Sequence, residues 1–268
     1  MKSILLFANE DDAFQGRLAA AIHLARQFDA KISCVQVTPY DSFIMGDPFG
    51  GVYALPTVVE QVGEVEAEHR HRAEQALKAA DVHWEWLNYE GHPGHVMLER
   101  SRLADVAVVS LPGERTRDHQ SSVAADLAIH ARTPVLATPT AGADFQTSGT
   151  AMVAWNGSAE SAHALRFASP MLAKAAAVHI VTIAGERLTI TAAEAAHYLS
   201  QHGVEAKLHH LRAGSDAVAE TLIDEAAKLD ANYIVAGAYG HSRLRELVLG
   251  GVTRKLIQRS PLPLLLAH

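Results

Sequence analysis

Residues 5–9 read Leu-Leu-Phe-Ala-Asn, and residues 152–156, which lie 147 positions later, read Met-Val-Ala-Trp-Asn. Each is a short apolar run that ends in a turn, as expected of a buried strand. The same offset, applied without a gap, also superposes residues 18–28 on 165–175 and residues 30–35 on 177–182. Self-similarity at a fixed offset predicts that the chain contains two copies of one structural unit.

The two halves also end alike. Residues 104–110 resemble residues 231–237, and residues 133–137 resemble residues 262–266. Each half is therefore predicted to be five strands alternating with four helices. Continuous apolar strands indicate a sheet covered on both faces, and the alternation favours parallel strands. The predicted fold class is α/β, with two tandem doubly wound units, each a five-stranded parallel sheet flanked by helices.

We place the first unit at residues 1–140 and the second at residues 150–268. The segment Thr140–Thr150 is rich in Ala, Gly, Thr and Ser and is the expected linker. In the first unit, Pro39–Pro56 carries several glycines and prolines and is predicted to be a long loop. A helix is expected to follow it, from about Val58 to Ala80.

Composition limits the classes of function. The 268 residues are 49% hydrophobic and 20% charged, with a net charge of −7, so nothing favours a nucleic-acid or membrane partner. No apolar run approaches membrane-spanning length. The sequence starts with a strand pattern and no recognisable leader, from which we expect a cytoplasmic location. The single cysteine, Cys34, lies in an apolar run and is expected to be a buried, unreactive thiol.

A glycine pattern occurs only in the second copy. Gly237, Gly240 and Gly250 follow a predicted strand with the spacing Gly-x2-Gly-x9-Gly, and Gly251 comes next. Glycines allow the backbone to approach a ligand closely. Residues 252–259 are predicted to form a helix, so the amides of Gly251, Val252 and Thr253 would lie at its N-terminus. Such an end binds anions through free amides and the helix dipole.

Three other turns should meet this glycine segment, because ligands of open parallel sheets bind beyond the carboxyl ends of the strands. They are the turn Trp155–Ser158, in which Ser158 can cap a helix, the strand end near Ile183, and the turn at Gly214. The competing interpretation is that these glycines only form tight turns.

On the repeat, the glycine spacing and the closing Pro-x-Leu strand, the whole chain resembles a tandem universal stress protein. The resemblance implies a stress-response regulatory protein that binds ATP or another adenine nucleotide, with or without Mg²⁺, and without efficient catalysis. The implied nucleotide-binding residues, all in the second copy, are Ala154, Trp155, Asn156, Gly157, Ser158, Ile183, Gly214, Gly237, Gly240, His241, Arg243, Gly250, Gly251, Val252 and Thr253.

Two residues depart from the family pattern. Gly251 stands where family members carry a Ser or Thr hydroxyl, and Asn156 replaces the usual Asp. The Gly251 amide remains, and an Asn side chain can still hydrogen-bond a ribose or an adenine. Nucleotide binding is therefore expected to be weakened and not abolished.

The first copy departs further. The segment equivalent to the glycine pattern begins Ser110-Leu111-Pro112-Gly113, in which only Gly113 of the glycine frame remains and Pro112 lacks an amide donor. Residues 9–12, Asn-Glu-Asp-Asp, place carboxylates where phosphates would lie. This half is predicted to be structural, or to bind a different ligand at an edge that also includes residues 91–95.

Metal binding and catalysis find little support in the sequence. Of the 16 histidines, His92 and His95 form the best pair, but a zinc site needs more ligands. The chain has neither a P-loop nor a Gly-x-Ser-x-Gly elbow. We therefore assign no catalytic residue and no metal ligand. A slow ATP-hydrolysing or adenylating enzyme and a ligand-free interaction scaffold remain as alternatives.

The closing strands, Pro134–Thr138 and Pro263–His268, would leave exposed edges if unpaired. We expect them to pair with each other, so that the two copies form a pseudo-dimer within one chain. Association of two chains remains open.

Overall fold

The computed structural model describes residues 1–39, 44–46, 52–54, 56–113, 122–140, 145–184, 190–212, 217–238 and 251–268. The N-terminal half contains strands and helices in the order β1 Ser3–Phe7, α1 Phe14–Phe28, β2 Lys31–Thr38, β3 Ile44–Gly46, β4 Val52–Ala54, α2 Pro56–Ala79, β5 His83–Glu90, α3 Pro93–Arg100, a 3₁₀ turn Ser101–Leu103, β6 Val106–Ser110, α4 Val123–His130 and β7 Val135–Thr138.

Within its described residues, the C-terminal half repeats this order without the two short strands and the 3₁₀ turn. Its elements are β8 Thr150–Ala154, α5 Ala159–Leu172, β9 Ala177–Ala184, α6 Ala192–Gln201, β10 Ala206–Arg212, α7 Val218–Lys228, β11 Ala231–Gly237, α8 Gly251–Arg259 and β12 Leu264–Ala267.

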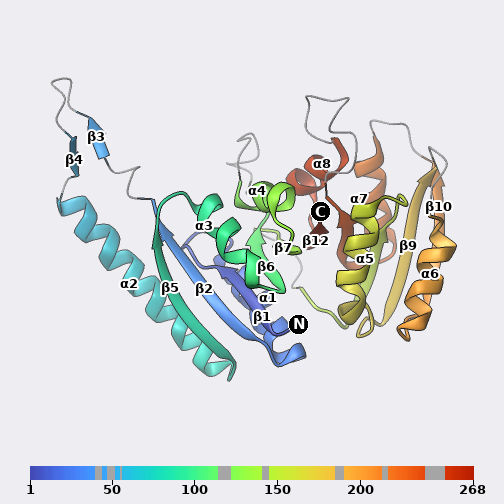
Figure 1. The fold of residues 1–268 in the computed structure, drawn as a ribbon, viewed down its shortest axis with the longest axis horizontal. Coiled ribbons are helices and arrows are strands. Elements are labelled where there is room, and N and C mark those ends of the chain that lie inside the picture. The colour runs from blue at the N-terminus through green and yellow to red at the C-terminus, as the bar shows by residue number, and fades with distance from the viewer. Residues whose placement is uncertain are drawn as a thin grey trace.

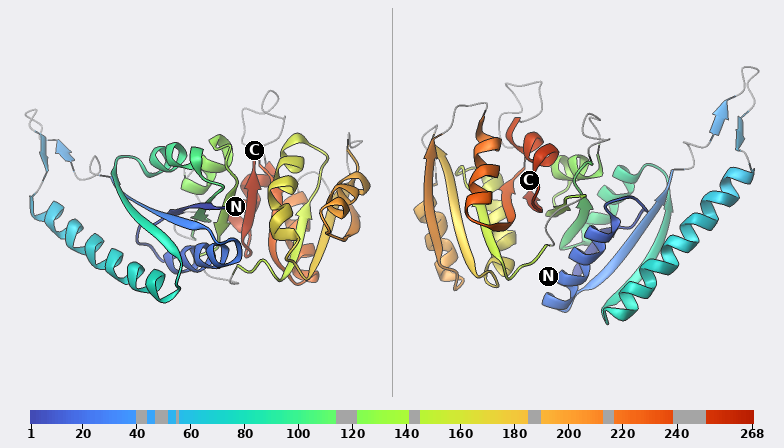
Figure 2. Two further views of the ribbon diagram at one scale, coloured as in Figure 1. Left: turned by 60° about the horizontal axis from the view of Figure 1, so that its bottom comes forward. Right: turned by 180° about the vertical axis from the view of Figure 1, so that it is seen from behind.

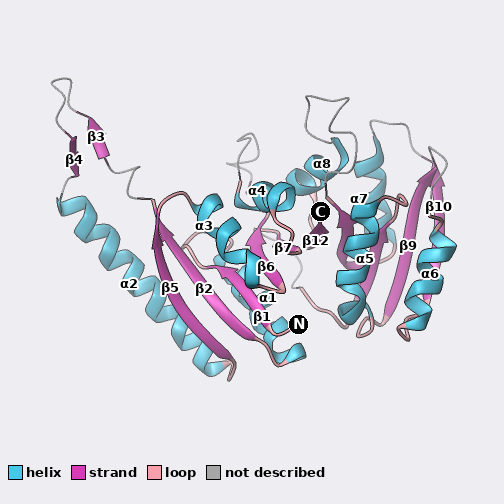
Figure 3. Cartoon of the chain, in the orientation of Figure 1, coloured by secondary structure: helices cyan, strands magenta, loops and turns pink. Residues whose placement is uncertain are grey.

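Ten strands form one sheet that runs through both halves (Figures 1 and 3). The strand order is β10-β9-β8-β11-β12-β7-β6-β1-β2-β5. All neighbours within a half are parallel, so each half is a five-stranded doubly wound unit, as predicted. The predicted fold class is confirmed.

The two halves join at the centre of the sheet. Strands β7 and β12 pair antiparallel, with Leu136 opposite Leu265. These two leucines are equivalent positions of the two copies, so an approximate two-fold axis passes between them. The predicted pairing of the closing strands within one chain is therefore present, and it leaves β5 and β10 as the outer strands of the sheet.

Helices cover both faces of the sheet. Alternate strand residues face opposite sides: Ile4 and Leu6 belong to a cluster covered by α1, α2, α5 and α6, whereas Leu5 belongs to one covered by α3, α4, α7 and α8. Both clusters include residues of both halves. Cys34 is fully buried in the first cluster, and burial raises the pKa of its thiol to about 12, in agreement with the predicted unreactive thiol.

The gapless superposition of the two copies is wrong by one residue. Ile4 pairs with Ile32 across β1 and β2, whereas the equivalent Ala151 pairs with Val178. The offset is thus 147 at the first strand and 146 at the second. One residue fewer therefore separates the paired strand positions in the second copy, and the same strand faces still point toward the same core cluster.

The predicted loop Pro39–Pro56 is also partly wrong. Its described residues include β3 and β4, which pair antiparallel with Ile44 opposite Ala54. This short hairpin stands beyond the outer end of α2 in both views of Figure 2. The helix that follows begins at Pro56, close to the predicted start.

The connection between the halves is not a loose linker where it is described. Phe145 is buried, and its ring lies edge-on to Tyr233 of β11 with 5.3 Å between centroids. The Thr147 amide donates to Nε2 of His23 on α1 at 3.0 Å. The connection therefore contributes to the core that both halves share.

Candidate functional site

The C-terminal half places its predicted site at the carboxyl end of β8. Strand β8 lies between β9 and β11, where successive connections leave in opposite directions, and doubly wound sheets bind ligands at such a switch point. The turn after β8 is tight: Gly157 has φ +72°, and the Ser158 amide donates to Oδ1 of Asn156 at 3.1 Å. Oγ of Ser158 accepts from the Ser161 amide at 3.1 Å, so Ser158 caps α5 as predicted.

Gly237 ends β11 directly beside the first turn of α5. A Cβ atom at this position would lie 2.5 Å from the Ser161 amide nitrogen and 2.7 Å from the Glu160 carbonyl carbon. Only glycine fits there, because real Cβ atoms do not approach backbone so closely. Packing of α5 on β11 therefore explains this glycine without any ligand.

Helix α8 begins on the other side of the same strand end. Oγ1 of Thr253 donates to the Gly237 carbonyl at 3.4 Å, which brings the first turn of α8 to the end of β11. Gly251 is the first residue of α8, and a Cβ atom added there would meet nothing within 4 Å. The helix N-terminus predicted as an anion site thus lies next to Gly237.

Some of the other predicted site residues are described by the structure, and the rest are not. Ala154 and Ile183 are half-buried at the ends of β8 and β9, and Val252 is half-buried in α8. Trp155 is buried, and its Nε1 donates to the Ile190 carbonyl at 3.1 Å, so its ring has a structural role. Gly214, Gly240, His241, Arg243 and Gly250 lie outside the described residues.

The equivalent edge of the N-terminal half contains a pocket of ≈ 460 Å³. It opens at the carboxyl ends of β1 and β6, the switch point of this half. Its walls combine apolar side chains with the carboxylates of two acids. The lining residues are Phe7, Asp11, Asp12, Ala13, Arg17, Ser110, Leu111, Pro112, Gly113, Val123 and Thr140.

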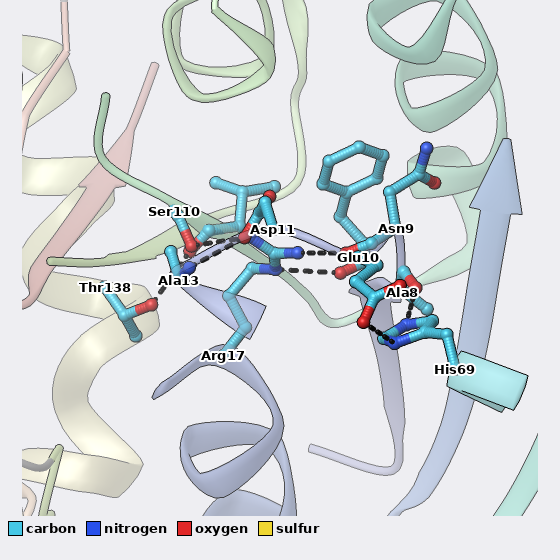
Figure 4. Close-up of polar contacts among 11 residues, drawn as sticks. Ala8, Asn9, Glu10, Asp11, Ala13, Arg17, His69, Ser110 and Thr138 are labelled. Carbon is cyan, nitrogen blue, oxygen red and sulfur yellow. Dashed lines mark hydrogen bonds and ion pairs between the residues drawn. The ribbon is translucent and has the colours of Figure 1, made fainter. Parts of the chain in front are cut away.

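Arg17 of α1 lines this pocket and is fully buried. Figure 4 shows its polar contacts. Its Nη1 donates to both carboxylate oxygens of Asp11 at 2.8 Å and to Oγ of Ser110 at 2.9 Å. Nε donates to the Phe7 carbonyl at 2.9 Å, and Nη2 to the Asn9 carbonyl at 2.6 Å. Burial lowers the pKa of the guanidinium, and Asp11 opposes that shift. Arginine remains charged in proteins, so a buried cation balances the Asp11 carboxylate.

The acidic segment after β1 is mostly engaged with the protein itself. Asn9 bonds both backbone groups of Val37 on β2, at 2.7 and 2.8 Å. Glu10 contacts Arg72 of α2 and lies 3.9 Å from Nδ1 of His69. Phosphate oxygens would meet Asp11 and Asp12 at this pocket, because both acids line it. The geometry favours the prediction that this half does not hold a phosphate.

The sequence analysis overlooked two charged residues at these edges. Arg17 lies on the apolar stripe of α1, between Phe14 and Ala21, and a charge on such a stripe was the available signal. Its counterpart in the second copy is Ala164. The other is Glu160, the second residue of α5, whose counterpart is Ala13. Glu160 is only 8% exposed.

Histidines do not gather into a metal site in the part of the chain that the structure describes, where no group of three or more potential ligands occurs. The rings of His92 and His95 lie 5.2 Å apart between centroids, without a third ligand. His69 is buried against the Ala8 carbonyl at 2.8 Å, while His71 is exposed, so the two side chains point away from each other. None of the described helices is long and apolar enough to cross a membrane.

Comparison with known proteins bears on the half that carries the glycine pattern. The sequence model of the universal stress protein family matches residues 148–268. These residues belong to the universal stress protein family. A universal stress protein of Synechocystis sp., Slr1230, is 28% identical over 173 residues, which cover 60% of this chain and 57% of that relative.

Solved structures extend the likeness to both halves of the chain, as a likeness of fold. A universal stress protein of Archaeoglobus fulgidus superposes on 99% of this chain and 96% of its own, with a TM-score of 0.74 and 15% identity. A functionally unknown protein of Pseudomonas aeruginosa covers 100% of this chain and 92% of its own, with a TM-score of 0.63 and 15% identity. The tandem arrangement of the sheet is thus shared with both.

Proposed function

We propose that this universal stress protein binds ATP, or another adenine nucleotide, through its C-terminal unit, residues 150–268, and acts in stress regulation without efficient catalysis. The observation that carries the proposal is the position of α8. Its N-terminus lies beside Gly237 at the switch point of the half that matches the family. Backbone amides at such a helix end suit phosphate oxygens.

The N-terminal unit, residues 1–140, has a different role in this proposal. Its pocket presents Asp11 and Asp12, and its buried cation already has a partner. A phosphate there would face these carboxylates, and the Arg17 guanidinium in the pocket wall is already bonded to Asp11. We therefore assign the nucleotide to one site per chain.

Gly251 offers a direct test, because a side chain introduced at this position would enter open space. Gly251→Ser restores the hydroxyl of the family pattern and should tighten ATP binding by about 10- to 150-fold, given roughly 1.5–3 kcal/mol for a hydrogen bond to a charged group. Gly251→Asp should abolish binding by placing a carboxylate at the phosphates, while an acid in the first turn stabilises the helix. Isothermal titration with ATP and thermal unfolding measure the two effects.

The outcomes separate the proposal from its alternatives. Absence of heat with millimolar ATP for both the wild type and Gly251→Ser would contradict nucleotide binding. Steady turnover of labelled ATP by the pure protein would instead favour an enzyme. Mass spectrometry of small molecules released on denaturation identifies any nucleotide that copurifies.

A further inference from the structure

Glu160 is a buried acid whose charge the described residues do not balance. Its side chain is 8% exposed, and Oε2 has no hydrogen-bond partner among them. A buried carboxylate without a partner is costly, and proteins usually pair such a group or use it to hold a metal ion. The favourable dipole at the start of α5 accounts for an acid in the first turn, but it leaves this oxygen without a bond.

The position of Glu160 relates it to the proposed nucleotide site. Its Cβ lies 3.0 Å from where a Gly237 Cβ would stand, so it adjoins the strand end next to α8. Its counterpart in the first copy, Ala13, lines the N-terminal pocket. The repeat thus places Glu160 at the wall of the equivalent space in the C-terminal half.

The two copies differ in whether a cation balances the acidic side chain at this edge of the sheet. In the N-terminal half, Arg17 balances Asp11. In the C-terminal half, Ala164 replaces the arginine, and Oε2 of Glu160 has no hydrogen-bond partner in the part of the chain that the structure describes. A nucleotide arriving without a cation would add several negative charges beside this carboxylate. The charges at this edge would then repel one another.

We infer that Glu160 holds a divalent cation delivered with the nucleotide, so that the site binds the Mg²⁺ complex of ATP in preference to free ATP. Mg²⁺ in proteins is typically held by one or two carboxylates together with substrate phosphates and water. One carboxylate suffices in that arrangement. The lack of a three-ligand cluster among the described residues fits an ion that needs the phosphates. The inference rests on the proposed function.

The test titrates the full-length chain with ATP, once in excess Mg²⁺ and once in a chelator. The wild type should lose at least about tenfold in affinity without Mg²⁺, which corresponds to 1.4 kcal/mol. Glu160→Gln preserves the size of the side chain and removes its charge, so its affinity should become nearly independent of Mg²⁺. Glu194→Gln is the matched control, because Glu194 is an exposed acid in the first turn of α6 and should leave the dependence unchanged.

Each outcome of these titrations supports or overturns the inference about Glu160. Equal wild-type affinity with and without Mg²⁺ overturns the inference whatever the variant does, and leaves the proposed function standing. A Glu160→Gln protein that unfolds at a lower temperature but keeps the wild-type Mg²⁺ dependence shows a purely structural role, and also overturns it. Absence of binding in both buffers contradicts the proposed function itself.

Discussion

Arg17 places a positive charge inside the N-terminal half, and its surroundings decide what that charge does. Its acceptors come from the end of β1, the turn after it, and β6, so one side chain links several segments that meet at the switch point. Only the guanidinium of this ion pair is buried, because the Asp11 side chain is 44% exposed. Removing Asp11 would therefore leave a buried charge without compensation, whereas removing Arg17 would leave a carboxylate that water can reach. Its contribution is therefore best measured by removing one partner and then both.

We expect Arg17→Met to lower the free energy of unfolding by about 1–3 kcal/mol, because the carbonyls of Phe7 and Asn9 lose their donor. Asp11 is 44% exposed and regains water, so the double variant Arg17→Met with Asp11→Asn should be no more stable than Arg17→Met. Arg72→Met removes an exposed pair with Glu10 and should cost no more than about 1 kcal/mol. Urea unfolding measures all three, and a loss below about 1 kcal/mol for Arg17→Met contradicts this account.

Unlike Arg17, Tyr233 has a buried polar group that no hydrogen bond from the described residues satisfies. The side chain is fully buried in β11, and its hydroxyl has no hydrogen-bond partner among the described residues. Burial raises the pKa of the phenol, so the group stays neutral. Tyr233→Phe should keep the ring contact with Phe145 and raise the free energy of unfolding by about 1 kcal/mol, since an unsatisfied buried group costs roughly that much. Destabilisation by Tyr233→Phe in chemical unfolding would reveal a partner for the hydroxyl.

A histidine pair connects β9, β10 and α7 near the outer edge of the C-terminal half. Nδ1 of His179 lies 2.8 Å from Nε2 of His209, and Nδ1 of His209 lies 3.7 Å from Glu225. Burial lowers the pKa of His179, with further lowering by His209 and Lys207 and an opposing effect of Glu225. The folded state therefore favours the neutral ring.

A lowered histidine pKa gives stability that is present above the unfolded pKa, about 6.5, and is lost as the pH falls below it. We expect the wild type to lose more unfolding free energy than His179→Gln between about pH 7.5 and about pH 5.5. His197→Gln, at an exposed position of α6, serves as the control and should follow the wild type. Parallel stability curves for the wild type and His179→Gln would contradict the role of His179.

The strands and helices were largely predictable, because apolar runs and cap residues are local signals. Ser158 is an example, since a serine before an alanine-rich helix is a cap by composition alone. The hairpin of β3 and β4 was missed because three-residue strands are too short to show alternation. The one-residue change of offset before β9 was missed because either register aligns apolar residues.

The candidate site was less predictable, for reasons that concern packing. The sequence shows Gly237 but not that α5 presses against it, and a packing glycine looks the same as a phosphate-loop glycine. Likewise, Glu160 lies in the first turn of α5, and its burial becomes evident only when the helix is placed on the sheet. Helix ends and caps depend on neighbouring residues in the sequence and can be predicted from it. The pairing of charges between separate helices and strands depends on the folded arrangement and cannot.

At the scale of the whole molecule, the halves share one sheet and one pair of cores. Leu136 and Leu265 meet at the centre, and Phe145 of the connection packs on Tyr233. An edge strand left open at β7 or β12 would be a site of aggregation, which the antiparallel pairing removes. We therefore expect the two halves to unfold together, in one cooperative transition.

The three tryptophans can test this cooperativity, because Trp84 and Trp86 lie on β5 while Trp155 follows β8. Trp155→Phe leaves reporters only in the N-terminal half, and the double variant Trp84→Phe with Trp86→Phe leaves one only in the C-terminal half. We expect Leu136→Ala, which opens a cavity costing about 2–5 kcal/mol, to lower the urea midpoint of both reporters equally. A shift confined to the Trp84 and Trp86 signal would mean that the halves unfold independently, and that the central strand pair joins them without coupling their stability.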